Sequence, residues 1–129
     1  MNDEVEHLNS PAFARLGLPF SEIVRVGKTL YLSGQIGNLP GGLTLAEGGI
    51  CGQARQALAN IRASLEAHGH SMSQVVKCTV MLADMAEWPA FNEIYREFFA
   101  PPYPARSAFA AAGLAVGGRV EIEVVAHAG

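Results

Sequence analysis

The last strand-like run of the chain reads Arg119-Val120-Glu121-Ile122-Glu123-Val124-Val125-Ala126-His127. Its apolar side chains recur at every second position, and successive side chains of an extended chain point to opposite sides. This period of two predicts a β-strand with one buried, apolar face and one more polar face. The rest of the chain must therefore supply neighbouring strands beside it and a layer that covers its apolar face.

The segments that precede this run predict further strands. Residues 106–112 are strand-like, and residues 74–83 are apolar on both faces, so we expect this second strand to be covered on both sides. In residues 74–83, Val76 is expected to share one face with Cys78. Residues 21–26 and 29–36 predict a β-hairpin that turns at Gly27-Lys28. Residues 1–18 show no period and predict an irregular lead-in.

Two segments have a helical period instead. Residues 50–68 place apolar side chains at spacings of three and four, with polar residues such as Gln53 mostly on the opposite side. Residues 87–99 repeat aromatic side chains in the same way and end before Pro101-Pro102. The order β-β-α-β-α-β-β predicts an α+β fold, in which two helices pack on one face of a mixed sheet. We expect one domain over residues 1–129.

Composition narrows the class of protein. Charged residues make up 16% of the 129 residues, below the usual fraction of about 25%, which indicates apolar surface buried between subunits. The net charge of −3 excludes a basic field for nucleic acid or an anionic membrane. Cys51 and Cys78 predict free, reduced thiols. With no apolar secretory signal at the N-terminus, we expect a cytoplasmic protein. The four histidines lack zinc spacing, so no metal is expected.

Arg106 and Glu121 are the first candidates for chemistry. An arginine is a rigid fork that matches a carboxylate through two hydrogen bonds, but spacing alone favours a solvated arginine or a structural ion pair, because a single arginine is no motif. Glu121 and Glu123 alternate on the polar face of the last strand. One of them could position water or accept a proton if that face lines a cleft. Two exposed glutamates are the alternative interpretation.

Three further residues could line such a cleft. Gly34 would allow a ligand close to the backbone, and Ser33 could donate a hydrogen bond to it; a bulged strand end is the alternative. Asn92 lies among the aromatic residues of the second helix, where a surface or capping amide is also expected.

Several motifs together resemble the RidA (YjgF) family. Pro104-Ala105-Arg106-Ser107, followed by residues 119–123, is similar to the C-terminal signature of that family. Leu32-Ser33-Gly34-Gln35-Ile36 resembles its early Ser-Gly-Gln-Ile segment, and residues 52–61 and 91–99 resemble its two helices. The matches run in family order over about residues 19–127, which makes the combination specific although each motif alone is weak.

The resemblance implies a chorismate-mutase-like fold and a homotrimer, with a central barrel of three sheets and ligand clefts between subunits. It also implies a hydrolase similar to 2-iminobutanoate/2-iminopropanoate deaminases, which converts reactive 2-imino or enamine acids to 2-keto acids and ammonia without a cofactor. By the same resemblance, Arg106 clamps the substrate carboxylate and Glu121 positions water. Ser33, Gly34 and Asn92 fall on pocket positions.

Two pocket positions depart from the family pattern and indicate a divergent subgroup. Phe20 stands where well-studied members have tyrosine, and Ala108 stands where they often have cysteine. These changes keep open a second function, a trimer that binds a small carboxylate such as a 2-keto acid as a sensor, without turnover. A role as an endoribonuclease or translation inhibitor is disfavoured by the negative charge, and the sequence does not address a chaperone role.

Overall fold

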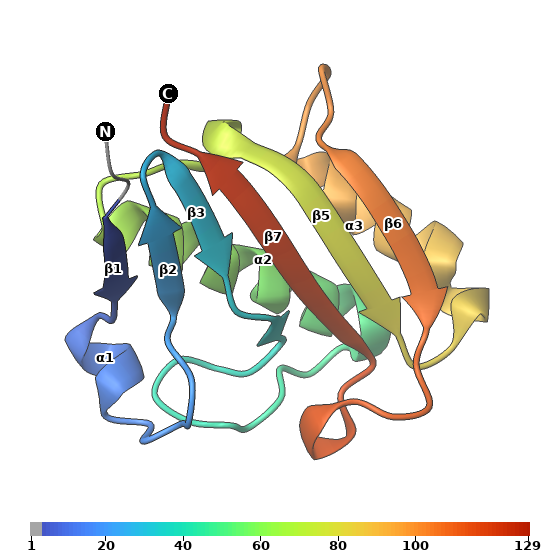
Figure 1. Cartoon of the computed structure of the whole chain (residues 1–129). Coiled ribbons are helices and arrows are strands. Elements are labelled where there is room, and N and C mark those ends of the chain that lie inside the picture. Colours follow the sequence, from blue (N-terminus) through green and yellow to red (C-terminus); the bar gives the residue numbers. More distant parts are fainter. Residues whose placement is uncertain (1–3) are drawn as a thin grey trace.

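A computed structural model describes residues 4–129, and Figure 1 shows how they form one twisted sheet with helices behind it. In the middle of the sheet, β7 (Val120–His127) pairs antiparallel with β5 (Val75–Leu82). The edge strand β6 (Ala105–Ala110) pairs parallel with β5. On the other side of β7 lie β3 (Thr29–Leu32), β2 (Ile23–Val26) and β1 (Val5–Leu8). The sheet is therefore mixed, as predicted.

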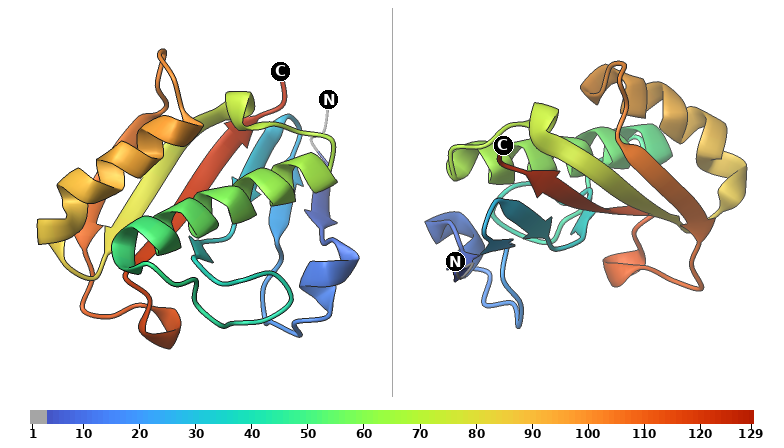
Figure 2. Two further views of the ribbon diagram at one scale, coloured as in Figure 1. Left: turned by 180° about the vertical axis from the view of Figure 1, so that it is seen from behind. Right: turned by 45° about the horizontal axis from the view of Figure 1, so that its top comes forward.

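Two long helices cover one face of this sheet. Figure 2 shows α2 (Gly49–Ala67) and α3 (Trp88–Phe98) side by side on the same face. A one-turn helix, α1 (Pro11–Ala14), lies near the N-terminal edge. Short 3₁₀ turns η1 (Met72–Gln74), η2 (Met85–Glu87) and η3 (Ala115–Gly117) connect the elements. The predicted α+β class and the two helices on one face are confirmed, while one chain does not test the predicted trimer.

The core lies between the helices and the inner face of the sheet. The alternation along β7 is confirmed, because Val120, Ile122, Val124 and Ala126 are at most 1% exposed. They meet the stripe of α2, in which Leu58, Ile61 and Leu65 are fully buried. Burying one such side chain contributes about 1.5–3 kcal/mol. This apolar layer fixes which residues of each strand face the helices and which remain for a site.

The irregular lead-in predicted for residues 1–18 is wrong for much of that range. Val5–Leu8 form the edge strand β1, which pairs antiparallel with β2. The side chain of Ser10 then caps α1 by accepting a hydrogen bond from the backbone N–H of Phe13 at 3.3 Å. The period is short because both elements have only four residues, too few for a pattern to stand out. Residues 1–3 of the lead-in lie outside the described residues.

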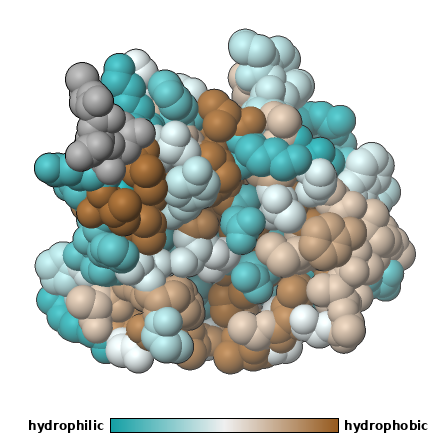
Figure 3. Space-filling view, viewed as in Figure 1, coloured by the Kyte–Doolittle hydropathy of each residue, from teal (hydrophilic) through white to brown (hydrophobic). Residues whose placement is uncertain are grey.

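Strand β5 also differs from its prediction. A β-bulge between Val75 and Lys77 inserts one extra residue, so Val75 is buried and Val76 is 49% exposed. A bulge reverses the alternation on one side of it, which explains why Val76 does not share the face of Cys78. The chain covers only one face of this strand. Figure 3 shows the other face of the sheet, where apolar and polar side chains are mixed.

Gln53 is a further correction, since the helical pattern placed it away from the core. Its side chain is buried, and its Oε1 accepts a hydrogen bond from the backbone N–H of Arg119 at 2.8 Å. This bond ties α2 to the first residues of β7, where a loop ends and a backbone donor would otherwise lack a partner. The second strand of the predicted hairpin is also interrupted at Ser33-Gly34, after which β4 (Gln35–Ile36) pairs with β7.

Two expectations about compartment can be compared with the structure. Cys51 and Cys78 are free thiols, as predicted, and Cys78 is fully buried. Among residues 4–129, no helix combines the length and the apolar character that crossing a bilayer requires.

Candidate functional site

Arg106 lies on the edge strand β6, with its side chain toward α3. It pairs with Cys78 of β5, and directly paired residues point to the same face, which here is the helix-covered face. Its guanidinium carbon lies 4.7 Å from the ring centroid of Tyr95, 5.8 Å from that of Phe91 and 5.9 Å from that of Trp88. Aromatic faces attract cations, so three rings hold this charge in place.

The surroundings of Arg106 leave its hydrogen-bond donors available. Within residues 4–129 the guanidinium forms no ion pair with a carboxylate, so the structural ion pair considered above is absent from this part of the chain. It lines a pocket of about 330 Å³ together with residues of α3 and the loop before β6. A cation without a carboxylate partner at the wall of an open pocket can bind an anion from solution, and a guanidinium fork suits a carboxylate.

Asn92 lies in the same pocket and has a matching feature. Its Oδ1 is buried and has no hydrogen-bond partner among the described residues. A buried acceptor without a partner costs about 1–3 kcal/mol, and a ligand N–H or O–H donor would remove that cost. The pocket therefore presents a cation for a carboxylate, and Asn92, with its shielded amide oxygen, forms part of the wall. Ala108 follows two residues after Arg106 on the same face of β6 and packs against the core.

The tyrosine below Arg106 acts as a neutral ring. Burial, with the hydrogen bond to Cys78, raises the pKa of the Tyr95 hydroxyl. That hydroxyl donates to the Cys78 Sγ at 3.5 Å. Burial likewise raises the pKa of the Cys78 thiol, so it stays protonated and is a poor nucleophile.

Glu121 lies on the opposite face of the sheet. It alternates with the buried residues of β7 and pairs with Met81 and Ile36 of its neighbours. Burial, and to a smaller extent the charge of Glu123, raises the pKa of its carboxyl. A carboxyl with a raised pKa exchanges protons more readily near neutral pH. Its carboxylate lies so close to Gly34 that a Cβ on residue 34 would overlap it, which explains the glycine at this position.

A second pocket surrounds Glu121. It measures about 270 Å³, and Phe20 and Gly34 line it together with mainly apolar residues. Ser33 does not line it: this residue borders a third hollow beside Glu123. The Ser33 hydroxyl donates to the Ser21 carbonyl at 2.6 Å, and the Ser33 N–H donates to the Glu22 carbonyl at 3.1 Å. Ser33 thus holds the neighbouring loop. Because its hydroxyl hydrogen is already donated, the hydroxyl can only accept a hydrogen bond from a ligand.

The candidate residues therefore form two groups on opposite faces of one chain. Arg106 and Asn92 line the pocket beside α3, whereas Phe20, Gly34 and Glu121 line the pocket on the other face. The structure of one chain does not bring Arg106 and Glu121 together. Sequence reasoning could not separate them, because alternation along each strand does not say how the faces of two different strands correspond.

Several pocket residues were not anticipated as such. Trp88 and Tyr95 belong to the helical pattern predicted for residues 87–99, yet both line the pocket of Arg106 together with Tyr103, which lies directly before the motif of that arginine. Phe13 and Val116 line the pocket of Glu121. One sequence feature could have indicated the pocket of Arg106, namely that this arginine follows closely after a helix rich in aromatic residues. Within residues 4–129, no group of three or more His, Cys, Asp or Glu side chains could hold a metal ion.

The fold and the two pockets define a small α+β protein with an unpaired arginine at the wall of one pocket, within the described residues, and a half-buried glutamate in the other. A family model described as Endoribonuclease L-PSP matches residues 12–128. Over nearly its whole length, therefore, the chain belongs to this family, also known as RidA or YjgF, as its motifs indicated.

Curated relatives and solved structures agree with this assignment. A goat protein (Capra hircus) named 2-iminobutanoate/2-iminopropanoate deaminase is 42% identical over 130 residues, which cover 100% of this chain and 95% of that protein. The human protein of the same name is 45% identical and covers 86% of this chain and 81% of its own length. The crystal structure of RidA from an Antarctic Psychrobacter species is 36% identical, with a TM-score of 0.81 and 98% of each chain covered.

Proposed function

We propose that this chain is a hydrolase that converts reactive 2-imino acids to 2-keto acids and ammonia. The observation that carries the proposal is Arg106, whose guanidinium is held by aromatic rings at the wall of a pocket and has no carboxylate partner within the described residues. Support comes from the curated relatives, which are named deaminases of two such imino acids and match most of the chain. The proposed reaction requires no cofactor.

The residues have distinct roles in this reaction. Arg106 binds the substrate carboxylate and so fixes the imine carbon relative to the other groups. Glu121 accepts a proton from water as the water oxygen bonds to the carbon of the protonated imine, which gives a carbinolamine. Glu121 then passes this proton to the nitrogen and takes the proton of the carbinolamine hydroxyl as the carbon–nitrogen bond breaks, so that ammonia leaves and the keto carbonyl forms; the last proton passes from Glu121 to the departing ammonia. The raised pKa of Glu121 suits a group that takes and returns a proton.

Because Arg106 and Glu121 lie on opposite faces, the proposal includes a homotrimer with clefts between subunits. Arg106, Asn92 and Ala108 would come from one subunit, and Phe20, Ser33, Gly34 and Glu121 from its neighbour. The uncovered sheet face supports this arrangement, since Tyr31 and Phe109 are 51% and 48% exposed there. Large exposed apolar side chains on one face are typical of a subunit interface.

The central test measures ammonia release from a 2-imino acid generated in the assay by an amino-acid oxidase. We expect the wild type to accelerate release and Arg106→Ala to lose at least about a hundredfold in rate, because the substrate is no longer oriented. Arg55→Ala is the matched control, since Arg55 is an exposed arginine that pairs with Glu97 away from both pockets. Full activity in Arg106→Ala would contradict the assigned site.

Mixing two inactive variants tests the shared site. Arg106→Ala and Glu121→Gln are each expected to be inactive as pure proteins. When they are co-expressed, roughly a quarter of the clefts in random trimers would combine an intact Arg106 with an intact Glu121 from the neighbour. We expect activity to return in the mixture. If both residues act within one subunit, the mixture stays inactive.

Two other functions are outcomes of the same experiments. Tight binding of a 2-keto acid without any rate acceleration would favour the sensor considered from the sequence.

We also propose that nucleic acid is not a partner, because the net charge is −3. Salt-dependent binding of single-stranded RNA by freshly purified protein would contradict this. The cytoplasm remains the proposed location, supported by the two free cysteines.

A further inference from the structure

The pocket around Glu121 is built mainly from hydrocarbon. Its walls come from the N-terminal segment, the loop before α2 and the turn before β7. The larger apolar side chains on these three segments are Phe13, Leu16, Leu18, Phe20, Leu43 and Val116. A volume of about 270 Å³ exceeds what a methyl or ethyl group would fill, and lies just below the range of about 300–1,000 Å³ for whole small-molecule sites. A space of this size and chemistry fits one medium-sized apolar group.

Val116, in the turn before β7, lines the pocket with a strained backbone conformation. Its backbone has a φ of 50° and a ψ of 27°, the left-handed region, and among residues 4–129 it is the one non-glycine residue with a positive φ. A β-branched residue is a marked outlier there, and such conformations cost about 1–3 kcal/mol. The side chain is 54% exposed, so burial in the core does not offset this cost. The strained turn places an isopropyl group at the pocket.

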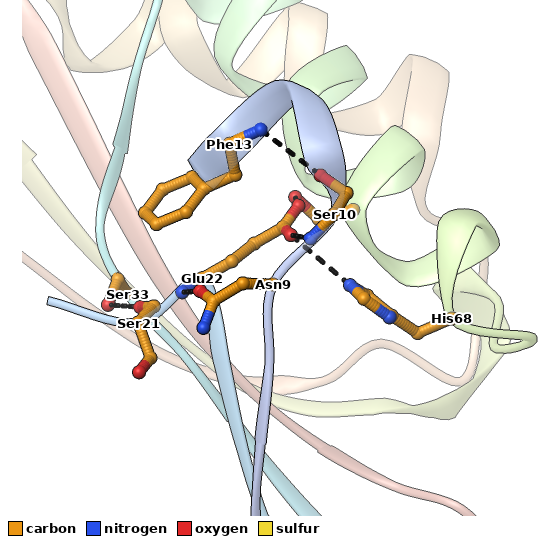
Figure 4. A network of polar contacts seen from close by, with 8 residues as sticks. Asn9, Ser10, Phe13, Ser21, Glu22, Ser33 and His68 are labelled. Carbon is orange, nitrogen blue, oxygen red and sulfur yellow. Dashed lines mark hydrogen bonds and ion pairs between the residues drawn. The ribbon is translucent and has the colours of Figure 1, made fainter. Parts of the chain in front are cut away.

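The opposite wall is anchored by a buried polar network, which Figure 4 shows. The Glu22 carboxylate accepts from the Ser10 N–H at 2.9 Å and lies 3.2 Å from the His68 Nε2. It also accepts from the Ser64 hydroxyl at the far end of α2. These bonds fix the start of α1, from which Phe13 reaches the pocket. The ring of Phe13 packs on the ring of Phe20, with 5.8 Å between the two ring centroids.

We propose that this pocket binds the hydrocarbon side chain of the 2-imino acid, and that Val116 and Phe13 determine substrate specificity. The inference rests on the proposed function and adds a substrate class to it. Imines of aliphatic amino acids such as leucine fill the pocket, whereas the alanine-derived imine leaves it empty. A charged side chain would lose its hydration against apolar walls. Each methylene group that leaves water strengthens the binding.

The test compares kcat/KM for the leucine-derived and alanine-derived imines in the assay described above. We expect the wild type to favour the leucine-derived imine by about tenfold or more. Val116→Asn is the informative variant, because asparagine tolerates the left-handed backbone without the apolar branch. We expect this variant to lose most of the preference, because kcat/KM for the leucine-derived imine falls when the apolar branch is removed. Leu39→Asn is the control, since Leu39 is 44% exposed in a nearby loop and does not line the pocket.

The outcomes separate the two proposals. Turnover of both imines without preference, or an unchanged preference in Val116→Asn, overturns the specificity pocket and leaves the proposed function intact. If no imine is turned over, the proposed function fails. Affinities for 2-keto acids measured by calorimetry then test whether the pocket binds an apolar side chain. In that case the wild type is expected to bind 4-methyl-2-oxopentanoate at least about tenfold more tightly than pyruvate, with a difference that Val116→Asn reduces. Equal affinities would overturn the pocket as well.

Discussion

At the scale of single residues, a few close contacts decide what the pockets can do. The clearest is the approach of the Glu121 carboxylate to Gly34, where the absence of a side chain provides the space. Gly34 was a candidate from the sequence because glycine allows close approach to the backbone. The sequence could not show that its own chain, through Glu121, makes that approach.

Gly34→Ala is expected to lower kcat by about a hundredfold, because the new methyl group displaces the Glu121 carboxylate from its position. The fold should remain, since the carboxylate is at the end of a flexible side chain. Ammonia release and circular dichroism together check this. Gly42→Ala provides the control, because a Cβ at Gly42 would meet no atom within 4 Å. Unchanged kcat in Gly34→Ala would argue against a role for Glu121.

Tyr95 offers a second prediction at this scale. Tyr95→Phe keeps the ring below Arg106 and removes the hydroxyl that donates to Cys78. We expect little change in KM and a loss of at most about 1.5 kcal/mol in the free energy of unfolding. Tyr95→Leu removes the ring, and we expect KM to rise several-fold as Arg106 loses one aromatic support. Equal KM values for both variants would show that the ring does not position the arginine.

At the scale of elements, long periodic segments were predictable and short ones were not. The pattern of α2 extends over five turns, so its buried stripe was evident apart from Gln53, whose polar side chain is buried only because Arg119 offers it a backbone donor. β1 is held by its pairing with β2, and the start of α1 by the hydrogen bond from Ser10 to Glu22, rather than by a local pattern. Such contacts leave no periodic signal in the sequence.

The Glu22 network gives these short elements a pH dependence. Burial alone would raise the pKa of Glu22, but the hydrogen bonds from Ser64, Ser10 and His68 outweigh it and hold the pKa below its ordinary value. A carboxyl with a lowered pKa in the folded state stabilises that state above its ordinary pKa. The contribution is lost as the pH falls through the folded-state pKa.

Glu22→Gln should therefore reduce the free energy of unfolding by about 1–3 kcal/mol at neutral pH, with a difference that narrows in acid. Urea unfolding at fixed protein concentration and two pH values measures it. Glu93→Gln is the comparison, since the Glu93 side chain is 76% exposed in its pair with Arg96 and should change stability by less than about 0.5 kcal/mol. A difference that persists unchanged in acid would contradict the ionised network.

At the scale of the whole molecule, the distribution of the candidate residues over two faces is the main result. The motifs identified the residues and the family, but spacing along a chain carries no information about which face of the sheet each pocket occupies. The low charge content predicts an interface, and we propose that it lies on the open sheet face.

Phe109→Asp places a charge on that open face and is expected to convert the proposed trimer to monomers and to abolish turnover. Light scattering coupled to size-exclusion chromatography measures the mass, and circular dichroism should show a retained fold. Ala63→Asp adds the same charge to an exposed position of α2, on the covered side of the sheet, and should leave mass and activity unchanged. A trimeric Phe109→Asp protein would place the interface elsewhere.

Placing Arg106 and Glu121 on opposite faces has a consequence for how the protein responds to dilution. In a single dissociated copy, Arg106 and Glu121 could not reach the same substrate molecule. Specific activity should therefore fall toward zero as association is lost, while each copy stays folded. The specific activity of the protein would then rise with its concentration, in addition to the rise in total activity that more molecules give. Inactivation by dilution or mild heating would precede the loss of helix signal, and replenishing the protein would restore activity without refolding.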